Sequence, residues 1–265
     1  SLRPQKVLDG YRIAVVSAKD DTRFNDAFML GINAEAAGKG VSAEFIQLPE
    51  IDIRSLNFGD YLLSIDADGI IALYFRNSAL PFYHVLREGR DIVTDIITDE
   101  LPALPSVQTG NFRHAQEAGR LFLEQGYRRF LVVGHSPLKR NRRYEGIYDV
   151  IKNRCDDIRY VCLGDHDSIK EIDSFFSAFD KHSAVFSVDY SSNYITAAMF
   201  MQHRLEVKNN NFLVYDCEEE FFSYHGLKPV KKVGPSIFTI GRELCRTLIT
   251  KRETGAYPLP LQRKI

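Results

Sequence analysis

The sequence predicts an α/β protein built from parallel β-sheets with helices on both faces. Short apolar segments with strand character alternate with longer segments whose apolar residues recur at helical spacing, and this alternation continues along the chain. The strand segments are apolar at successive residues, as expected when both faces of a strand are covered. The polar, proline-containing segment 101–111 interrupts the alternation midway, which favours two lobes over one wide sheet.

The expected elements follow one another mostly as strand and helix. Strands are expected at residues 11–17, 43–48, 68–74, 91–97, 130–134, 159–163, 183–188 and 211–215. Helices are expected at residues 24–38, 53–65, 81–90, 111–125, 142–154, 168–181, 191–207 and 239–252. Strands that are joined through helices run parallel, because a crossover connection returns the chain to the same edge of the sheet.

Residues 111–135 show the pattern most clearly. Ala118 and Phe122 are part of an apolar series at helical spacing, and Gly126 stands where a helix needs a left-handed residue after its last turn. The run FLVV at 130–133 is short and fully apolar, which suits a buried parallel strand.

Composition narrows the classes of protein. An apolar content of 45% is enough for packed cores and excludes a disordered chain. The net charge of −1 gives no general reason to expect binding to nucleic acid or to an anionic membrane. There is no apolar run of about 20 residues, so no membrane-spanning helix is expected. Residues 1–10 lack the apolar core of a secretory signal, which favours the cytoplasm.

The common catalytic and metal-binding motifs are not met. The turn after the first strand (SAKDDTRF) lacks the glycines of a dinucleotide-binding loop, and residues 37–40 lack the upstream glycine and the Ser or Thr of a P-loop. Leu138 occupies the place of the last glycine of a nucleophile elbow. The four cysteines form no C-x-x-C pair, and the histidines show no metal-ligand spacing. The cysteines are therefore expected to be thiols in the core of a protein from a reducing compartment. We therefore expect no enzyme, no cofactor and no metal, and an α/β hydrolase with paired carboxylates stays a remote alternative.

A series of short motifs follows a distinctive order along the chain. It comprises Asp68-Gly69-Ile70-Ile71, Thr94-Asp95, Asn111 with its helix and the corner Gln125-Gly126-Tyr127-Arg128-Arg129, Arg143-Tyr144-Glu145-Gly146, Val214-Tyr215-Asp216 and Gly241-Arg242. In order and spacing, the series resembles the LacI/GalR family of transcriptional regulators, whose effector domain has the periplasmic sugar-binding-protein fold. Gly110, Val188 and Val214 stand where that family usually has Asp, Asn and Gly, so its ligand set is not carried over whole.

This resemblance implies a two-lobed, type I periplasmic-binding-protein-like fold with a three-crossover hinge. The N-terminal lobe would comprise residues 11–110 plus 235–253, and the C-terminal lobe residues 111–234 plus 254–265. Residues 1–10 would be the remnant of a linker, so operator DNA would be bound only through an N-terminal helix-turn-helix absent from this chain. Family members are usually homodimers, and the first helices of the N-terminal lobe are the expected interface.

The resemblance also implies a ligand site beyond the carboxyl ends of the strands, in the cleft between the lobes. The resemblance favours a role for Arg143 in which its planar fork bridges two neighbouring hydroxyls or a carboxylate, and the alternative is one more exposed arginine of the basic run KRNRR. Asp95, Asp189 and Asp216 could accept hydrogen bonds from ligand hydroxyls, and the alternative is that they cap turns or helices. Phe24 could stack on an apolar sugar face or be simple packing. The further cleft candidates are Asn25, Tyr74, His166 and Tyr190.

The sequence therefore predicts the effector-sensing domain of a bacterial LacI-type regulator that binds a small ligand, most simply a sugar. The main alternative is a solute-binding protein of a sugar uptake system, which would have the same fold and cleft but an export signal instead of a DNA-binding module.

Overall fold

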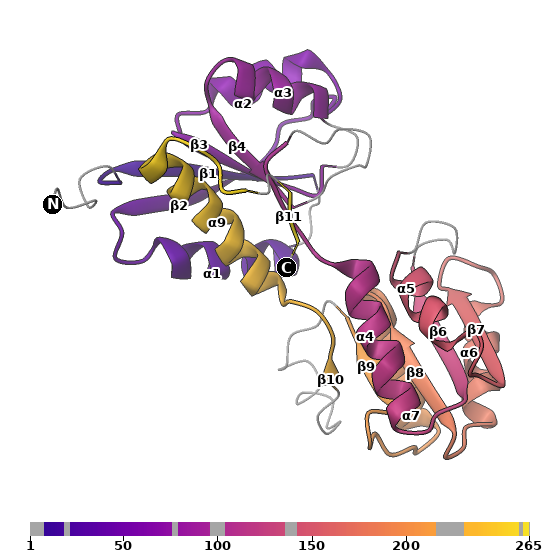
Figure 1. Ribbon diagram of the computed structural model, residues 1–265. Helices are drawn as coiled ribbons and strands as arrows, with labels where there is room; N and C mark the ends of the chain where they lie inside the picture. Colours follow the sequence, from indigo (N-terminus) through magenta and orange to yellow (C-terminus); the bar gives the residue numbers. More distant parts are fainter. Residues whose placement is uncertain are drawn as a thin grey trace, which may run out of the picture. The chain divides into compact units, whose positions relative to one another are not determined.

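Two compact units make up the chain. The computed structural model describes residues 8–18, 22–75, 79–95, 104–135, 142–215, 231–259 and 262–264. Unit 1 comprises Ser1–Thr109 and Ile237–Ile265, and unit 2 comprises Gly110–Ser236. Each unit is a parallel β-sheet with helices on both faces, as the sequence predicts (Figure 1).

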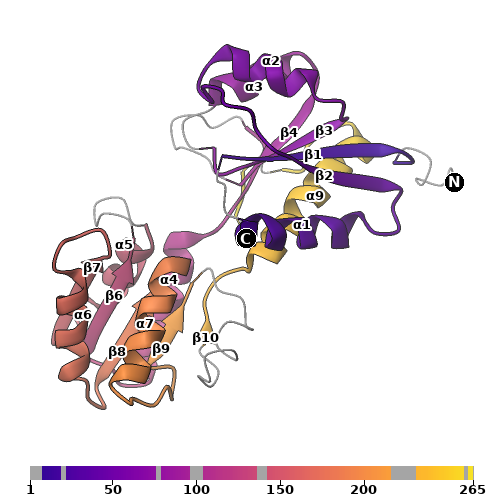
Figure 2. The ribbon, with the colours of Figure 1, turned by 180° about the vertical axis from the view of Figure 1, so that it is seen from behind.

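Unit 1 contains a six-stranded sheet with the order β11–β5–β4–β3–β1–β2. Its strands are β1 (Tyr11–Ser17), β2 (Val41–Ile46), β3 (Gly69–Leu73), β4 (Asp91–Thr94), β5 (Ser106–Gln108) and β11 (Gln262–Lys264). Its helices are α1 (Thr22–Ala36), α2 (Leu56–Ser64), α3 (Ala79–Arg87) and α9 (Ile237–Thr254). Helices α2 and α3 cover one face of this sheet and α1 and α9 the other (Figures 1 and 2).

Successive residues of the central strand β3 point into different cores, as expected for a strand buried on both faces. Ile71 and Leu73 belong to the core beneath α1 and α9. Ile70 and Ala72 belong to the core beneath α2 and α3. The apolar run that identified this strand in the sequence thus supplies both cores of unit 1.

Two glycines let α1 and α9 approach each other closely. A β-carbon added to Gly31 would overlap the carbonyl oxygen of Phe238, and one added to Gly241 would overlap the carbonyl oxygen of Phe28. The contact is reciprocal, with each helix presenting a glycine to the backbone of the other. Only a residue without a side chain permits this spacing.

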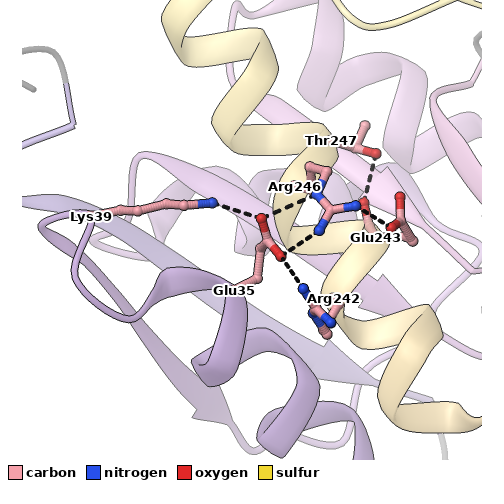
Figure 3. A network of polar contacts seen from close by, with 6 residues as sticks. All are labelled: Glu35, Lys39, Arg242, Glu243, Arg246 and Thr247. Carbon is pink, nitrogen blue, oxygen red and sulfur yellow. Dashed lines mark hydrogen bonds and ion pairs between the residues drawn. The ribbon is translucent and has the colours of Figure 1, made fainter. Parts of the chain in front are cut away.

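A buried carboxylate also links the same two helices by hydrogen bonds and ion pairs (Figure 3). Glu35 of α1 has a 6% exposed side chain and accepts hydrogen bonds from Lys39 at 2.6 Å and from Arg246 of α9 at 2.8 and 3.1 Å. Arg242 adds an ion pair at 3.4 Å. Burial alone would raise the pKa of Glu35, but the hydrogen bonds and charges of Arg246 and Lys39 outweigh it and lower the pKa to about 2. Glu35 is therefore ionised at any physiological pH.

Unit 2 contains a five-stranded sheet with the order β10–β9–β8–β6–β7. Its strands are β6 (Arg129–Gly134), β7 (Asp157–Cys162), β8 (Ser183–Ser187), β9 (Phe212–Val214) and β10 (Lys231–Lys232). Its helices are α4 (Asn111–Glu124), α5 (Arg142–Ile151), α6 (Ser168–Ser177) and α7 (Tyr190–Gln202). Helix α4 lies before the sheet in Figure 1 and α7 before it in Figure 2, on opposite faces.

The C-terminal segment belongs to unit 1, so the expectation that residues 254–265 join the second lobe is wrong. Strand β11 pairs in parallel with β5, and Tyr257 fixes the chain before it by hydrogen bonds between its hydroxyl group and the backbone of Ile92. The chain consequently passes between the units twice, after Thr109 and after Ser236, rather than three times.

Three short strands, β5, β10 and β11, were not expected from the sequence. Each has only two or three residues, which is too short for an apolar period to be recognised. Within the residues that the structure describes, no helix has the length and apolar character needed to cross a membrane.

Candidate functional site

In unit 1, four of the predicted residues lie at the carboxyl ends of adjacent strands. Strands β4, β3 and β1 are neighbours in the sheet, and parallel strands end at the same edge. Asp95 follows β4, Tyr74 follows β3, and Phe24 and Asn25 lie in the first turn of α1, which follows β1. The rings of Phe24 and Tyr74 contact edge to face, with centroids 6.0 Å apart. We call these four residues the unit 1 cluster.

The carboxylate of this cluster bonds to the protein backbone. Oδ1 of Asp95 accepts a hydrogen bond from the backbone N–H of Tyr74 at 2.8 Å. Tyr74 has a φ of +64°, a left-handed conformation that is unusual for an aromatic residue. Asn25 is 7% exposed and so is largely buried. The unit 1 cluster therefore presents half-buried aromatic rings next to buried polar groups.

In unit 2, Arg143 is held at the carboxyl end of the sheet. Its Nε donates to Oδ1 of Asn111 at 3.0 Å, and its Nη1 donates to the carbonyl oxygen of Val188, just after β8. Its guanidinium carbon lies 3.7 Å from the centroid of the Tyr215 ring, close enough for a cation–π contact. The half-buried Arg143 is therefore an oriented residue and not one more exposed arginine of the basic run.

Tyr215 is in turn fixed from several directions. Its hydroxyl group shares a hydrogen bond with Nδ1 of His114 at 3.0 Å, and its carbonyl oxygen accepts from Nδ2 of Asn193 at 3.0 Å. Gly234 has a φ of +84°, and a β-carbon there would lie 2.7 Å from Cζ of the Tyr215 ring. The ring is completely buried and packs against the guanidinium group of Arg143. We call Asn111, His114, Arg143 and Tyr215 the unit 2 cluster.

The pKa of His114 is lowered in this environment. Burial is the main cause; the carboxylate of Glu117 opposes it, and the charges of Arg113 and Arg143 reinforce it. A lowered pKa keeps the imidazole neutral at pH 7, with one nitrogen as donor and the other as acceptor. His114 can therefore bond to Tyr215 without adding a positive charge beside Arg143.

Asp189 has the capping role that the sequence left open as its alternative. Its Oδ1 accepts from the backbone N–H of Ser192 at 2.9 Å, in a capping box at the start of α7. Its Oδ2 accepts from the backbone N–H of His135 at 2.6 Å. Both carboxylate oxygens thus hold the backbone, which ties the end of β6 to the start of α7.

Of the remaining candidates, His166 joins neither cluster. His166 lies in the turn after β7 with a 95% exposed side chain, and its nearest ionic partner is the neighbouring Asp167. Asp216 and the side chain of Tyr190 lie outside the described residues. In the part of the chain that is described, no group of three His, Cys, Asp or Glu residues is placed to hold a metal ion.

Three residues of the unit 2 cluster were not among the predicted site residues. Asn111 and Tyr215 were recognised only as parts of motifs, and Tyr215 resembles core packing because it ends an apolar strand. His114 follows Asn111 by three residues, a spacing that puts both on one face of a helix. That spacing was the available signal for His114.

The fold is that of type I periplasmic-binding proteins. The chain matches a LacI transcriptional regulator from Lactobacillus brevis with a TM-score of 0.72 and 19% identity, covering 96% of this chain and 98% of that one. It matches a periplasmic sugar-binding protein of an ABC transporter from Legionella pneumophila with a TM-score of 0.70 and 14% identity, covering 96% and 98%.

A third similar structure is a carbohydrate transporter from Acidothermus cellulolyticus 11B in complex with myo-inositol. The TM-score is 0.65 and the identity 15%, with 96% of this chain and 91% of that chain covered. No protein-family model and no curated protein matches the sequence. Regulators and sugar-binding proteins thus share this fold with the chain.

Proposed function

We propose that the chain binds a small polyhydroxylated ligand, a sugar or a cyclitol, and serves as the effector-sensing domain of a LacI-type transcriptional regulator. The observation that carries this proposal is the unit 2 cluster, in which Arg143 is oriented at the carboxyl ends of the strands by Asn111, Val188 and Tyr215. Ligands of doubly wound sheets bind at this edge.

Each of the two clusters, taken by itself, offers chemistry that fits such a ligand. A guanidinium group carries N–H donors in a planar fork that matches neighbouring hydroxyl oxygens. The rings of Phe24 and Tyr74 suit the apolar face of a pyranose or cyclitol ring, because C–H groups pack well on aromatic surfaces. The similar structure from Acidothermus cellulolyticus holds a cyclitol, which supports this ligand class.

A titration tests the proposal. We would measure the heat of binding of myo-inositol, D-glucose, D-galactose and cellobiose to the chain and to Arg143→Ala. We expect at least one ligand to bind, and the variant to lose about tenfold or more in affinity, because a charged hydrogen bond contributes about 1.5–3 kcal/mol. Binding that is unchanged in Arg143→Ala would contradict the assigned site.

The neighbouring arginine provides a matched control. Arg142 precedes Arg143 in α5, but its side chain is 64% exposed and pairs with Glu145 at 2.5 Å. Arg142→Ala removes the same charge without touching the unit 2 cluster. We expect it to bind the ligand with wild-type affinity, so an equal loss in both variants would indicate a general effect of charge.

A solute-binding protein of a sugar uptake system is the second candidate, and the match to the Legionella pneumophila protein favours it. The two candidates differ in what the complete gene encodes. A helix-turn-helix ahead of these residues supports the regulator, whereas an export signal supports the uptake protein. In the regulator, ligand and operator would be linked by a reciprocal coupling free energy, typically 1–3 kcal/mol.

The regulator proposal includes a homodimer formed through α1. Leu30 on this helix is 65% exposed, so its side chain is available for an apolar contact with a second copy of the chain. We expect Leu30→Glu to raise the dimer dissociation constant in sedimentation equilibrium. Leu80→Glu is the control, since Leu80 is 60% exposed on α3 and should leave association unchanged.

A further inference from the structure

Tyr74 interrupts the alternation of strand β3. Ile71 and Leu73 point into the core beneath α1 and α9, so a regular strand would direct Tyr74 to the opposite face. Instead, Tyr74 packs against the same core as Leu73, and Phe75 belongs to the core beneath α2 and α3. The left-handed backbone at Tyr74, with a φ of +64°, produces this reversal.

The reversal directs Phe75 and Tyr74 to opposite faces of the sheet. The centroid of the Phe75 ring lies 5.2 Å from that of Phe58 and 5.5 Å from that of Phe82, within the aromatic core under α2 and α3. The Tyr74 ring turns toward the start of α1, where it contacts Phe24 at 6.0 Å and Phe28 at 5.8 Å. A half-buried tyrosine thereby reaches the edge of the sheet at which the unit 1 cluster gathers.

The side chain of Asp95 bonds to the backbone at the point of reversal. Thr94 lies opposite Ala72 in the parallel register of β4 and β3, so Asp95 comes next to the residues that follow β3. Its Oδ1 accepts the Tyr74 N–H at 2.8 Å. Among the residues that the structure describes, the other non-glycine residues with positive φ are Arg204, Asn209 and Asn210, which lie in the turn region after α7 and not at a strand end of this cluster.

We propose that Asp95 is a positioning residue: it holds Tyr74 in the left-handed conformation, and the Tyr74 ring, with Phe24, contacts the apolar face of the ligand. This inference rests on the proposed function for the ligand, but not for the clamp between Asp95 and Tyr74. It assigns Asp95 a role through Tyr74 in place of the direct contact to ligand hydroxyls that the sequence suggested. Tyr74 then determines specificity, because its ring favours ligands with a flat apolar face.

Amide hydrogen exchange at Tyr74, measured by NMR, tests the clamp without any ligand. We expect Asp95→Ala to speed exchange of the Tyr74 N–H about tenfold or more, since it loses its acceptor. Asp95→Asn keeps an Oδ1 acceptor and should stay within about threefold of the wild type. Unchanged exchange in Asp95→Ala would overturn the proposal.

Binding of myo-inositol, D-glucose and D-galactose to the same variants separates positioning from direct contact. We expect Asp95→Ala and Tyr74→Leu each to weaken binding about tenfold, and Asp95→Asn to restore most of the affinity. A large loss in Asp95→Asn with the Tyr74 amide still protected would mean that the charged carboxylate contacts the ligand, which also overturns the proposal. If no probe binds the wild type, the proposed function fails while the exchange measurement still decides the clamp.

Asp68 offers a matched control at the other end of the same strand. Its Oδ2 accepts the backbone N–H of Arg12 at 2.8 Å, so Asp68→Ala removes an equivalent hydrogen bond far from the cluster. We expect exchange at Arg12 to rise and ligand affinity to stay unchanged.

If Asp95→Ala does not fold, the Tyr74→Gly background provides the second test. Glycine adopts positive φ without a side-chain penalty, so the protein that carries Tyr74→Gly and Asp95→Ala together should fold, and its failure to fold would overturn the proposal.

Discussion

Unit 1 and unit 2 each pack two helices across one face of a parallel sheet, but the charged residue that links the two helices lies at a different end in each unit. In unit 1, Glu35 lies near the end of α1, eleven residues or about 16 Å of helix beyond Phe24. In unit 2, Arg143 lies in the first turn of α5 and bonds to the first residue of α4, at the strand ends. Under the proposed function, stability and binding are therefore separable in unit 1 and combined in one arginine in unit 2.

The glycine contacts are common to both units and should give the largest effects. An added β-carbon on Gly31 would overlap the Phe238 carbonyl oxygen, and on Gly146 it would overlap that of Phe112. We expect Gly31→Ala and Gly146→Ala each to lower the free energy of unfolding by roughly 3 kcal/mol, despite the better helix propensity of alanine. Urea denaturation measures this. Gly164→Ala should change it by less than about 1 kcal/mol, because its β-carbon would meet only Sγ of Cys162 at 4.0 Å.

Removal of the charge of Glu35 in unit 1 should lower the free energy of unfolding and leave ligand affinity unchanged. Glu35→Gln removes the carboxylate that Lys39, Arg242 and Arg246 share, and only Arg246 keeps a further ion pair in the described residues, with Glu243. We expect a loss of about 2 kcal/mol, below the usual cost of breaking a buried pair because the cationic side chains are 38–44% exposed. Glu206→Gln breaks an exposed pair with Lys208 and should cost less than about 1 kcal/mol. Weakened ligand binding in Glu35→Gln would contradict the separation.

Acid should reduce the advantage that Glu35 gives to the wild type. The folded pKa of about 2 lies below the unfolded value of about 4.3, so this stabilisation is complete above pH 4.3 and is lost as the pH falls toward 2. The difference in unfolding free energy between the wild type and Glu35→Gln should therefore shrink in urea titrations from pH 6 to pH 3. If the difference in unfolding free energy stayed constant, the charge of the Glu35 carboxylate would not be what stabilises the contact between α1 and α9.

The smallest effect, and the sharpest contrast, is expected from Tyr215→Phe. This change keeps the ring beneath Arg143 but removes the hydrogen bond to His114, at a cost of about 1 kcal/mol of stability and a few-fold of ligand affinity. Tyr127→Phe is the matched control, since its hydroxyl group donates to the carbonyl oxygen of Asn209 at 3.0 Å. It should cost similar stability and no affinity. Equal affinities for the two variants would show that stability and binding separate in unit 2 as well.

The sequence predicted the layered fold because apolar periodicity is a local signal. Helices such as α4 carry a helical apolar period, and strands such as β6 a continuous apolar run, over enough residues to be recognised. The pairing of β11 with β5 could not be predicted, because three polar residues join a sheet more than 150 positions away along the chain. The position of that segment depends on contacts such as those of Tyr257, which have no sequence signature.

The candidate site was predicted unevenly for a similar reason. Arg143 was identified by its motif, and the structure orients it. For Asp95 and Asp189, the sequence shows that a carboxylate follows a strand but not which group it accepts a hydrogen bond from. The structure gives backbone N–H groups as partners of both residues. Whether a strand-end aspartate faces a ligand or an amide is decided by the neighbouring strand, which is distant in sequence.

The division of unit 1 into two chain segments has a consequence for synthesis. Phe28 and Ile32 of α1 share a core with Ile240 and Leu244 of α9, which follow all of unit 2 in the chain. At ribosomal rates of about 5–20 residues per second, the 127 residues from 110 to 236 delay α9 by roughly 6 to 25 s. During that interval the apolar face of α1 lacks its partner, whereas unit 2 is continuous in sequence. We therefore expect the second unit to be the first to fold on the ribosome, and the N-terminal half of the nascent chain to be the part that chaperones bind.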